Sequence, residues 1–429
     1  MTDTSVTSGT AEDPRAPSGA ARVLLPSAGA GLAAHVDRLG PRPPGSPALI
    51  AEIGRSGLRG RGGAAFPTAI KLQALVGRRR PTVVANGTEG EPLSAKDKTL
   101  LLRSPHLVLD GLALVAEAVG ASAAYLCIDR SATRVASAVE AAVAERRAEG
   151  TDRLPVEIRL TPTRYVVGEE TALIHWLNGG DAKPLTTPPR PFERGIGGRP
   201  TVVQNVETLA QVALIARFGA DWFRRAGTPD EPGTVLLTVG GAVHQPGVYE
   251  VGLGSPLTTV LNSAGVETAP PAVLLGGYFG TWMAADALDR AVVGVEALRA
   301  AGASLGCGVV WVLPSDACGL ADSARIARWF AGQSAGQCGP CVNGLPAMAS
   351  ALERLVAGRG DRRLAADLDR WLRNVPGRGA CHLPDGASRF VASTLGTFGA
   401  EIDWHHQHGP CPAALGRPHL PTPHGGDWR

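Results

Sequence analysis

The chain has 429 residues, a formal net charge of +3, and 44 % hydrophobic residues. That length suits roughly two to four domains, and so small a charge argues against a nucleic-acid partner. No stretch reaches the roughly 18 uncharged apolar residues needed to cross a bilayer. The first twenty residues lack the basic and apolar regions of a signal peptide. The composition therefore predicts a globular, cytoplasmic protein.

The first half of the chain reads as a disordered tail followed by an α/β domain. Residues 1–45 are rich in Ala, Gly, Pro and Ser, which is typical of disorder. From 46 to 228, strand-like and helical patterns alternate. We expect strands at 82–86, 123–128 and 156–160, and helices at 106–119 and 131–148. Such alternation predicts a parallel sheet with ligand loops at the carboxyl ends of its strands.

The second half changes character twice. Residues 229–305 are short β-rich pieces with tight glycine turns around one short helix, which predicts a small mixed module. From 306 to 403, apolar residues recur at helical spacing and predict several packed helices. The tail 404–429 is rich in Pro, Gly and His and is expected to be loose.

The segment GLRGRGGAAFPTAIK (57–71) is the first candidate binding site. Glycines let successive N–H groups turn toward one point, as anion binding requires, and Arg59, Arg61 and Lys71 add positive charge. The segment is not a P-loop, because no Ser or Thr follows Lys71, and it lacks the dinucleotide-binding register. For one glycine-rich stretch alone, a flexible surface loop is an equally good explanation.

Three further segments carry polar residues where a strand meets a helix. VVANGTEGEPLSAKDK (83–98) follows a predicted strand, as does RPTVVQNVETLAQV (199–212), and YVVGEETALI (165–174) opens a helix. The helix dipole favours a negative charge at such an opening, and one cap would account for one of its two glutamates. The polar candidates in these segments are Asn86, Glu89, Glu91, Glu169, Glu170, Gln204, Asn205 and Thr208. A solvated acidic turn remains an alternative for Glu89 and Glu91.

These four segments together resemble the NADH-binding flavoprotein subunit of respiratory complex I, the family of NADH-quinone oxidoreductase F subunits. The resemblance spans about 50 to 400 and makes this chain a divergent member. It implies a Rossmann-like FMN domain with a parallel sheet over 46–228, then a β-grasp module of the SLBB type over 229–305. A helical bundle that carries an iron–sulfur cluster would follow over 306–403. In that family, FMN accepts a hydride from NADH and passes single electrons to the cluster.

The resemblance also implies roles for individual residues. The phosphate side of FMN would meet Gly60, Gly62, Gly63, Lys71, Asn205 and Thr208, and the flavin would meet Asn86, Glu89, Tyr165, Gly168 and Glu169. Arg61, Thr88, Val203 and Gln204 complete the implied cofactor-binding set. Glu91 and Glu170 would meet the nicotinamide nucleotide, and Phe66 would stack on its adenine. No catalytic side chain is implied, since hydride passes directly to the flavin.

The cysteines depart from the family pattern. The cluster-binding run is C-x-x-C-x-x-C in the family, but here Ala335 takes the first position and leaves Cys338, Cys341 and Cys381. A cluster normally has four thiolate ligands. Three thiolates can hold a [3Fe–4S] cluster, or a [4Fe–4S] cluster with a fourth ligand such as Ser334, Cys318, a histidine or water. Cluster loss is an alternative, as is zinc bound by Cys338 and Cys341 with two of His405, His406, His408 and Cys411. Cys127, Cys307 and Cys318 are expected to be buried structural thiols.

The nucleotide side departs as well. Thr88 replaces an aspartate, Ala74 an aromatic residue, and Thr187 and Arg190 a lysine and a phenylalanine of the family. Losing stacking rings weakens an adenine clamp, whereas a guanidinium such as that of Arg190 suits the 2′-phosphate of NADP(H). NAD(H) is therefore the first expectation and NADP(H) the second.

Two functions remain open at this stage. In the first, the chain is an NAD(P)H dehydrogenase-type flavoenzyme that feeds a ferredoxin-like or thioredoxin-like iron–sulfur protein, or a membrane-bound redox complex. In that case it would be cytoplasmic, either free or peripheral on the cytoplasmic face of a membrane complex. In the second, it is a degenerate flavin-binding or partner-binding module without nucleotide turnover.

Overall fold

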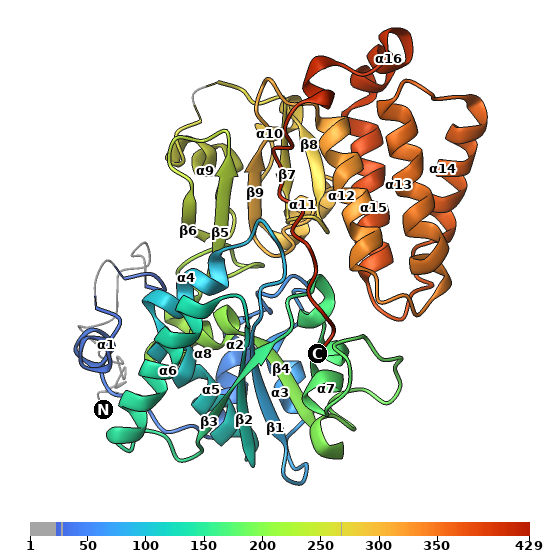
Figure 1. Ribbon diagram of the computed structural model, residues 1–429. Coiled ribbons are helices and arrows are strands. Elements are labelled where there is room, and N and C mark those ends of the chain that lie inside the picture. Colours follow the sequence, from blue (N-terminus) through green and yellow to red (C-terminus); the bar gives the residue numbers. More distant parts are fainter. Residues whose placement is uncertain (1–22, 27–28, 267) are drawn as a thin grey trace, which may run out of the picture.

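The computed structural model describes residues 23–26, 29–266 and 268–429. They form an α/β part, a second part built on a mixed sheet, and a set of C-terminal helices, arranged in that order along the chain (Figure 1). Each part has a hydrophobic core made mainly of its own residues.

The first sheet is fully parallel, with strand order β3-β2-β1-β4. Its strands are β1 (Thr82–Gly87), β2 (Ala123–Asp129), β3 (Val156–Thr161) and β4 (Thr201–Asn205). Asn86 of β1 is paired in register with Asn205 of β4, so both amides lie at the carboxyl edge of the sheet. This arrangement confirms the predicted α/β class and parallel sheet.

Helices cover both faces of this sheet. Val83 and Ala85 pack into the core under α5 and α8, whereas Val84 packs on the opposite face with α7, as the alternation of a strand requires. The helices of this part are α2 (Ala48–Ser56), α3 (Thr68–Gln73), α4 (Lys96–Arg103), α5 (Pro105–Val119), α6 (Thr133–Ala148), α7 (Glu170–Leu177) and α8 (Val206–Phe223). Short 3-10 turns cover Tyr165–Gly168 and Ile196–Gly198.

The second part is a five-stranded sheet of order β6-β5-β9-β7-β8, in which only β5 and β9 are parallel. Its elements are β5 (Thr234–Gly241), β6 (Gly247–Gly252), α9 (Leu257–Ser263), β7 (Ala272–Leu275), β8 (Thr281–Ala284), α10 (Ala285–Leu288), α11 (Val295–Ala300) and β9 (Val309–Val312). The predicted end of this module at 305 is too early, because β9 is its middle strand. Its pairing with β5 is long-range and leaves no mark in the local pattern.

The C-terminal helices pack against one face of this second sheet. Leu274 and Trp282 of the sheet share a core with Phe330 and Phe390 of the helices. The helices are α12 (Gly319–Gln333), α13 (Leu345–Val356), α14 (Arg362–Asn374), α15 (Leu383–Thr397) and α16 (Gly399–His408). A π-helical turn, η3 (Pro340–Gly344), precedes α13, and a 3-10 turn, η4 (Pro412–Leu415), follows α16.

Both ends of the chain differ from the prediction. Of the predicted tail 1–45, residues 1–22, 27 and 28 lie outside the described residues. Its remaining residues are ordered: Val23, Leu24 and Leu25 are buried, and α1 (Leu32–Leu39) packs near α5 and α6. Polar contacts between distant segments, rather than local apolar periodicity, explain why this order was missed.

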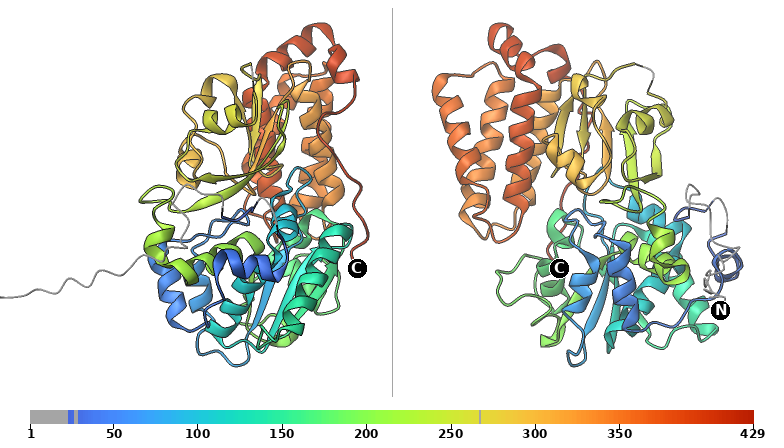
Figure 2. Two further views of the ribbon diagram at one scale, coloured as in Figure 1. Left: turned by 90° about the vertical axis from the view of Figure 1, so that its left-hand side faces the viewer. Right: turned by 180° about the vertical axis from the view of Figure 1, so that it is seen from behind.

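The predicted loose tail is instead helical and then extended. After α16, residues 416–429, called the C-terminal strap here, run back to the α/β part (Figure 2). Ala182 N donates to Trp428 O at 2.8 Å, and the Arg164 guanidinium lies 4.4 Å from the centre of the Trp428 ring. Carbonyls of Pro421 and Pro423 accept from Tyr278 and Trp329. These contacts hold a segment whose composition alone suggested disorder.

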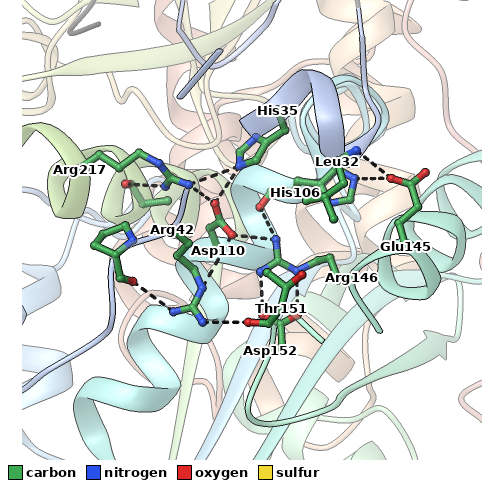
Figure 3. A network of polar contacts seen from close by, with 12 residues as sticks. Leu32, His35, Arg42, His106, Asp110, Glu145, Arg146, Thr151, Asp152 and Arg217 are labelled. Atoms are coloured by element: carbon green, nitrogen blue, oxygen red, sulfur yellow. Dashed lines mark hydrogen bonds and ion pairs between the residues drawn. The ribbon is translucent and has the colours of Figure 1, made fainter. Parts of the chain in front are cut away.

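A buried polar network, drawn in Figure 3, ties α1 to the α/β core. Asp110 of α5 is hydrogen-bonded to His35 at 2.8 Å, accepts from Arg146 at 2.7 Å, and pairs with Arg217 of α8. Arg146 also pairs with Asp152 at 2.7 Å. Charges from α5, α6 and α8 therefore neutralise one another in this core, and the hydrogen bond of His35 joins α1 to them.

Among the described residues, no single helix is both long and apolar enough to cross a membrane. The pair α4–α5, bent by 96°, meets the requirement by length and composition only.

Candidate functional site

The glycine loop lies against the start of α8. The Arg61 amide donates to Thr208 Oγ1 at 2.9 Å, and the Gly60 amide donates to Phe66 O at 2.9 Å. A Cβ on Gly62 would lie 3.2 Å from Asn205 Cβ, so glycine permits the close approach there. The first and fourth candidate segments are therefore in direct contact.

The second and third candidate segments also meet. Asn86 Nδ2 donates to Gly168 O at 2.8 Å, and Thr88 Oγ1 donates to Asn86 Oδ1 at 2.8 Å. A Cβ on Gly168 would lie 2.8 Å from Thr88 Oγ1, which leaves room for no side chain at that position. Tyr165 begins the same turn, so the turn is fixed against the end of β1.

Lys71 links the first candidate segment to the third and the fourth. Its Nζ donates to Glu170 Oε2 at 3.1 Å and to Val203 O at 2.8 Å, which links α3, α7 and β4. The lysine and the glutamate are each about 30 % exposed, so this pair borders solvent. Four segments that are far apart in sequence thus lie around the carboxyl ends of β1 and β4.

Two of the candidate glutamates hold the backbone of their own loops. Glu169 caps α7, since one carboxylate oxygen accepts from the amides of Thr171 and Ala172 at 3.0 Å each. Glu89 accepts from the amides of Asp97 and Lys98 at 2.9 Å each, at the start of α4. Of the pair Glu169 and Glu170, only the first is a cap, and the second faces Lys71.

Glu91 is a buried carboxylate at the contact with the second part. Its Oε2 accepts from the Tyr165 hydroxyl at 3.0 Å and from the Tyr278 amide at 2.9 Å. Burial raises the pKa of Glu91 to about 7, although these hydrogen bonds oppose the rise. Burial likewise raises the pKa of the Cys307 thiol well above its usual range, and the Glu91 charge adds to that rise.

Tyr278 and Cys307 were not predicted as neighbours of the site. Cys307 was expected to be a buried structural thiol; it is half-buried, and both it and Glu91 approach Gly277, where a Cβ would lie 2.9 Å and 2.7 Å from them. Gly277 has φ +82°, which favours glycine. The sequence GGYFG after a strand was the available signal, but only the packing of the two parts shows what it faces.

A buried group of charged side chains beside Asn205 was also not predicted. Asn205 Nδ2 donates to Asp97 Oδ2 at 2.7 Å, and Lys96 Nζ bonds Asp97 at 2.7 Å and Glu207 at 2.8 Å. Burial raises the pKa of Asp97 to about 6, even though the Lys96 charge opposes that effect. The three charged groups hold the Asn205 amide in a fixed orientation.

Several buried polar atoms around the site have no hydrogen-bond partner within the described residues: Gln204 Nε2, Arg61 Nε and Thr68 Oγ1. A cavity of about 350 Å³ also opens beside the glycine loop, toward the second part. Its lining includes Gly60, Arg61, Gly63, Arg299, Ser304 and Arg389. Phe66 follows the cavity-lining residue Ala65 in the chain and is 52 % exposed. Unpaired buried donors beside glycine backbone are what a polar, anionic ligand needs.

The three predicted cluster cysteines gather at the helical part. The Cys341 amide donates to Cys338 O at 3.1 Å. Cys338 and Cys381 both pack against the C-terminal core that contains Cys341. Burial raises the pKa of Cys341 to about 12, while a hydrogen bond from Ser334 opposes the rise. Burial raises the pKa of Cys381 to about 11. The charge of Glu169, which caps α7, adds to the rise in the pKa of Cys381.

The other cysteines separate from this group. Cys127 is buried in the core of the first sheet, as predicted. Cys318 instead gathers with His405 and Cys411, whose donor atoms all lie within 4.8 Å of one another. The zinc set that joined Cys338 and Cys341 to the C-terminal histidines is therefore wrong, because His405 and Cys411 face Cys318.

The comparisons with known proteins agree with this geometry. A model of the Nuo51 FMN-binding domain matches residues 53–214, and one of the NADH-ubiquinone oxidoreductase-F iron-sulfur binding region matches 321–405. An NADH-quinone oxidoreductase F subunit of Rhizobium meliloti (strain 1021), numbered 2 in that organism, is 33 % identical over 85 % of this chain and 90 % of its own length. The chain belongs to the family of NADH-quinone oxidoreductase F subunits. The F subunit of Streptomyces coelicolor is likewise 33 % identical, over 85 % of this chain and 84 % of its own.

A solved structure gives the same result for the fold. A chain of an NAD⁺-reducing [NiFe]-hydrogenase in the H2-reduced state superposes with a TM-score of 0.77 and 34 % identity. The match covers 86 % of this chain and 63 % of the hydrogenase chain, so this protein spans less than two thirds of that relative.

Proposed function

We propose that this chain oxidises NADH by hydride transfer to FMN and passes electrons through an iron–sulfur cluster to a protein partner. The observation that carries the proposal is the meeting of four separate segments at the carboxyl ends of β1 and β4, in a member of this F-subunit family. Bound FMN supplies the hydride acceptor and the change from two-electron to one-electron transfer. The protein supplies binding and orientation.

The phosphate side of FMN is assigned to the glycine loop and the start of α8. Gly60, Gly62 and Gly63 leave the backbone open, and Thr208 Oγ1 holds the Arg61 amide in place. The unpaired donors Gln204 Nε2 and Arg61 Nε support the fit, because a phosphorylated ligand is rich in acceptors. Asn205 and Lys71, each held by a carboxylate, complete the phosphate side.

The flavin side is assigned to Asn86, Tyr165 and Gly168. Since the Glu89 and Glu169 carboxylates accept from backbone amides, these two residues shape the pocket. Thr88 orients the Asn86 amide by donating to its oxygen. The amide nitrogen is thereby directed at Gly168 O, and a flavin edge would lie beside this fixed group.

The nicotinamide nucleotide is assigned to Glu91, Glu170 and Phe66. Phe66 exposes half of its surface and is free to stack on an adenine. Glu170 lies at the solvent border of the site through its pair with Lys71. NADP(H) is the second choice, through a bidentate contact of Arg190 with the 2′-phosphate.

The cluster is assigned to Cys338, Cys341 and Cys381. The Ser334 hydroxyl, hydrogen-bonded to Cys341, lies next to Ala335 and can supply an oxygen ligand to a fourth iron. A [4Fe–4S] cluster with Ser334, or a [3Fe–4S] cluster without it, fits these residues. The raised thiol pKa values mean that the cysteines need the metal's charge to become thiolates.

The remaining assignments follow the family. The second part is proposed to be a β-grasp module of the SLBB type that extends to β9, and the C-terminal helices an iron–sulfur-binding bundle. The electron acceptor is proposed to be a ferredoxin-like or thioredoxin-like iron–sulfur protein, or a membrane-bound redox complex. The protein would then act in the cytoplasm, on the periphery of such a complex.

One observation favours a second function. Ala335 removes a cluster ligand, and Thr88, Thr187 and Arg190 change the nucleotide side. A flavin-binding or partner-binding module without nucleotide turnover would show these changes too.

An anaerobic titration separates the two functions. The purified full-length chain is expected to show a flavin absorbance band that bleaches on addition of NADH, and more weakly with NADPH. A colourless preparation that FMN cannot reconstitute would refute the proposal, and a flavin band that neither nucleotide bleaches would favour the second function.

A variant tests the assignment of the flavin side. Asn86→Ala removes the bond to Gly168 O and is expected to weaken FMN binding about fivefold, since one such hydrogen bond contributes about 1 kcal/mol. Asn178→Ala is the matched control, because Asn178 bonds Gly195 O at the far end of α7. Equal FMN affinity in both variants would contradict the assignment.

A further inference from the structure

A cluster of metal-binding side chains lies apart from the redox site, where α12 begins and α16 ends. Cys318 precedes α12, Glu401 and His405 belong to α16, and Cys411 precedes η4. Glu401 and His405 are four residues apart and so lie on one face of α16. Three elements thus bring three possible ligands together, and Glu401 lies beside one of them, Cys318.

The distances suit a single ion. The donor atoms of Cys318, His405 and Cys411 lie within 4.8 Å of one another, and Cys318 Sγ is 3.7 Å from His405 Nε2. Glu401 Oε2 is 3.2 Å from Cys318 Sγ. In a tetrahedral zinc site with bonds of about 2.0–2.3 Å, neighbouring donor atoms lie roughly 3.3–3.8 Å apart. The donor atoms of Cys318, His405 and Cys411 are therefore near the spacing of zinc ligands. Glu401 contacts Cys318 of these three, and its Oε2 accepts from the Leu320 amide at 3.0 Å, so its carboxylate would have to turn to become the fourth ligand.

Each cysteine sulfur of the cluster accepts a backbone N–H from the first turn of a helix. The Ala321 amide donates to Cys318 Sγ at 3.3 Å, and the Ala414 amide donates to Cys411 Sγ at 3.3 Å. Such positions stabilise the thiolate form that binds metal.

The imidazole of His405 is also suitably arranged. The residue is 1 % exposed, and its Nε2 accepts from the Cys411 amide at 3.4 Å, so Nε2 is unprotonated and a metal ion would replace this amide as the partner of its lone pair. Its Nδ1 is buried and has no hydrogen-bond partner among the described residues. Two sulfurs, one imidazole nitrogen and one carboxylate oxygen form a donor set suited to zinc, whereas an iron–sulfur cluster would need more thiolates.

We propose that Cys318, Glu401, His405 and Cys411 bind a structural zinc ion. The ion joins α16 to the start of α12 and fixes the point from which the C-terminal strap leaves for the α/β part. The same strap carries Trp428, which packs on Arg164 next to Tyr165. The site is separate in residues from the proposed cluster, and its existence does not depend on the proposed redox function.

Metal analysis of three full-length proteins tests the proposal. Wild-type protein, purified anaerobically, is expected to hold about one zinc ion per chain. Cys411→Ser should lower its zinc affinity by more than the roughly 10- to 100-fold caused by loss of an outer contact, and should keep its iron. Cys381→Ser is the matched control, because it should lose iron and keep zinc.

A second variant and a cobalt absorption spectrum distinguish loss of a metal ligand from misfolding. His405→Gln should lose zinc as Cys411→Ser does, and cobalt bound to wild-type protein should give the absorption of a tetrahedral thiolate site that both variants lack. A zinc content that is negligible after zinc is added, or equal in wild type and Cys411→Ser, would overturn the proposal. A mass two units lower, from a Cys318–Cys411 disulfide in zinc-free protein, would overturn it as well.

Discussion

Asp110 and Glu91 are both buried carboxylates of the α/β part, yet their surroundings differ. Burial acts to raise the pKa of Asp110, but the His35 hydrogen bond and the charges of Arg146 and Arg217 outweigh it and hold that pKa well below its usual range. Glu91 has only a hydroxyl and backbone amides as partners, and burial raises its pKa to about 7.

The difference separates a structural carboxylate from one available for binding. Cations that neutralise Asp110 leave it no capacity for a ligand, whereas Glu91 has no cationic partner among the residues that the structure describes and lies where two parts of the molecule meet. A strongly perturbed carboxyl of this kind is a common feature of functional sites. The predictions below test whether this distinction holds.

The largest effect is expected from Asp110→Asn. The change leaves Arg217 and part of the Arg146 charge uncompensated in the core, and breaking a buried ion pair costs about 3–5 kcal/mol of unfolding free energy. Denaturant unfolding measures it. Asp152→Asn is the control with a smaller loss, because Asp152 is only partly buried and pairs with Arg146 alone. A loss below about 1 kcal/mol would show that the network is not a structural core.

Glu91→Gln is expected to stabilise the protein at pH 8. The folded state binds a proton at Glu91 more tightly than the unfolded state does, so wild-type stability falls as pH rises from about 4.5 to 7 and is constant above. The amide avoids that loss, which is on the order of 1–3 kcal/mol. Unfolding curves from pH 8 down to pH 5 should show the advantage shrinking. A difference that is constant with pH would contradict the raised pKa.

The smallest effect is expected from Arg328→Ala. Arg328 makes two bonds to Glu353, at 2.8 and 2.6 Å, but both side chains are more than 40 % exposed. Exposed pairs contribute about 0–1 kcal/mol, and salt screens them. Thermal unfolding at low and high salt should therefore differ little from wild type. A loss comparable to that of Asp110→Asn would mean that burial does not explain the contrast.

Local patterns were enough to predict much of the fold and to choose segments that the structure brings together. The strands at 82–86, 123–128 and 156–160 and the helix at 106–119 were found within one residue at each end, because their apolar periodicity is strong. Asn86, Gly168, Lys71 and Asn205 were proposed from their places at strand ends and glycine turns, and the structure brings them together.

Other features could not be predicted because they depend on long-range contacts. The pairing of β9 with β5, the strap held by Tyr278 and Trp329, and the order of residues 29–45 all rely on partners distant in sequence. The grouping of Cys318 with His405 and Cys411 is of the same kind, because a motif search pairs cysteines that are close in sequence.

The sequence by itself determined the α/β class, the family and which loops are candidates for binding, since periodicity, glycines and polar residues at strand ends are local properties. Tertiary structure alone decided which carboxylate is neutralised, which glutamate caps a helix, and which thiol lies beside His405 and Cys411. Those outcomes depend on burial and on charges brought from distant segments, and a pKa or a ligand set is a property of the assembled surroundings.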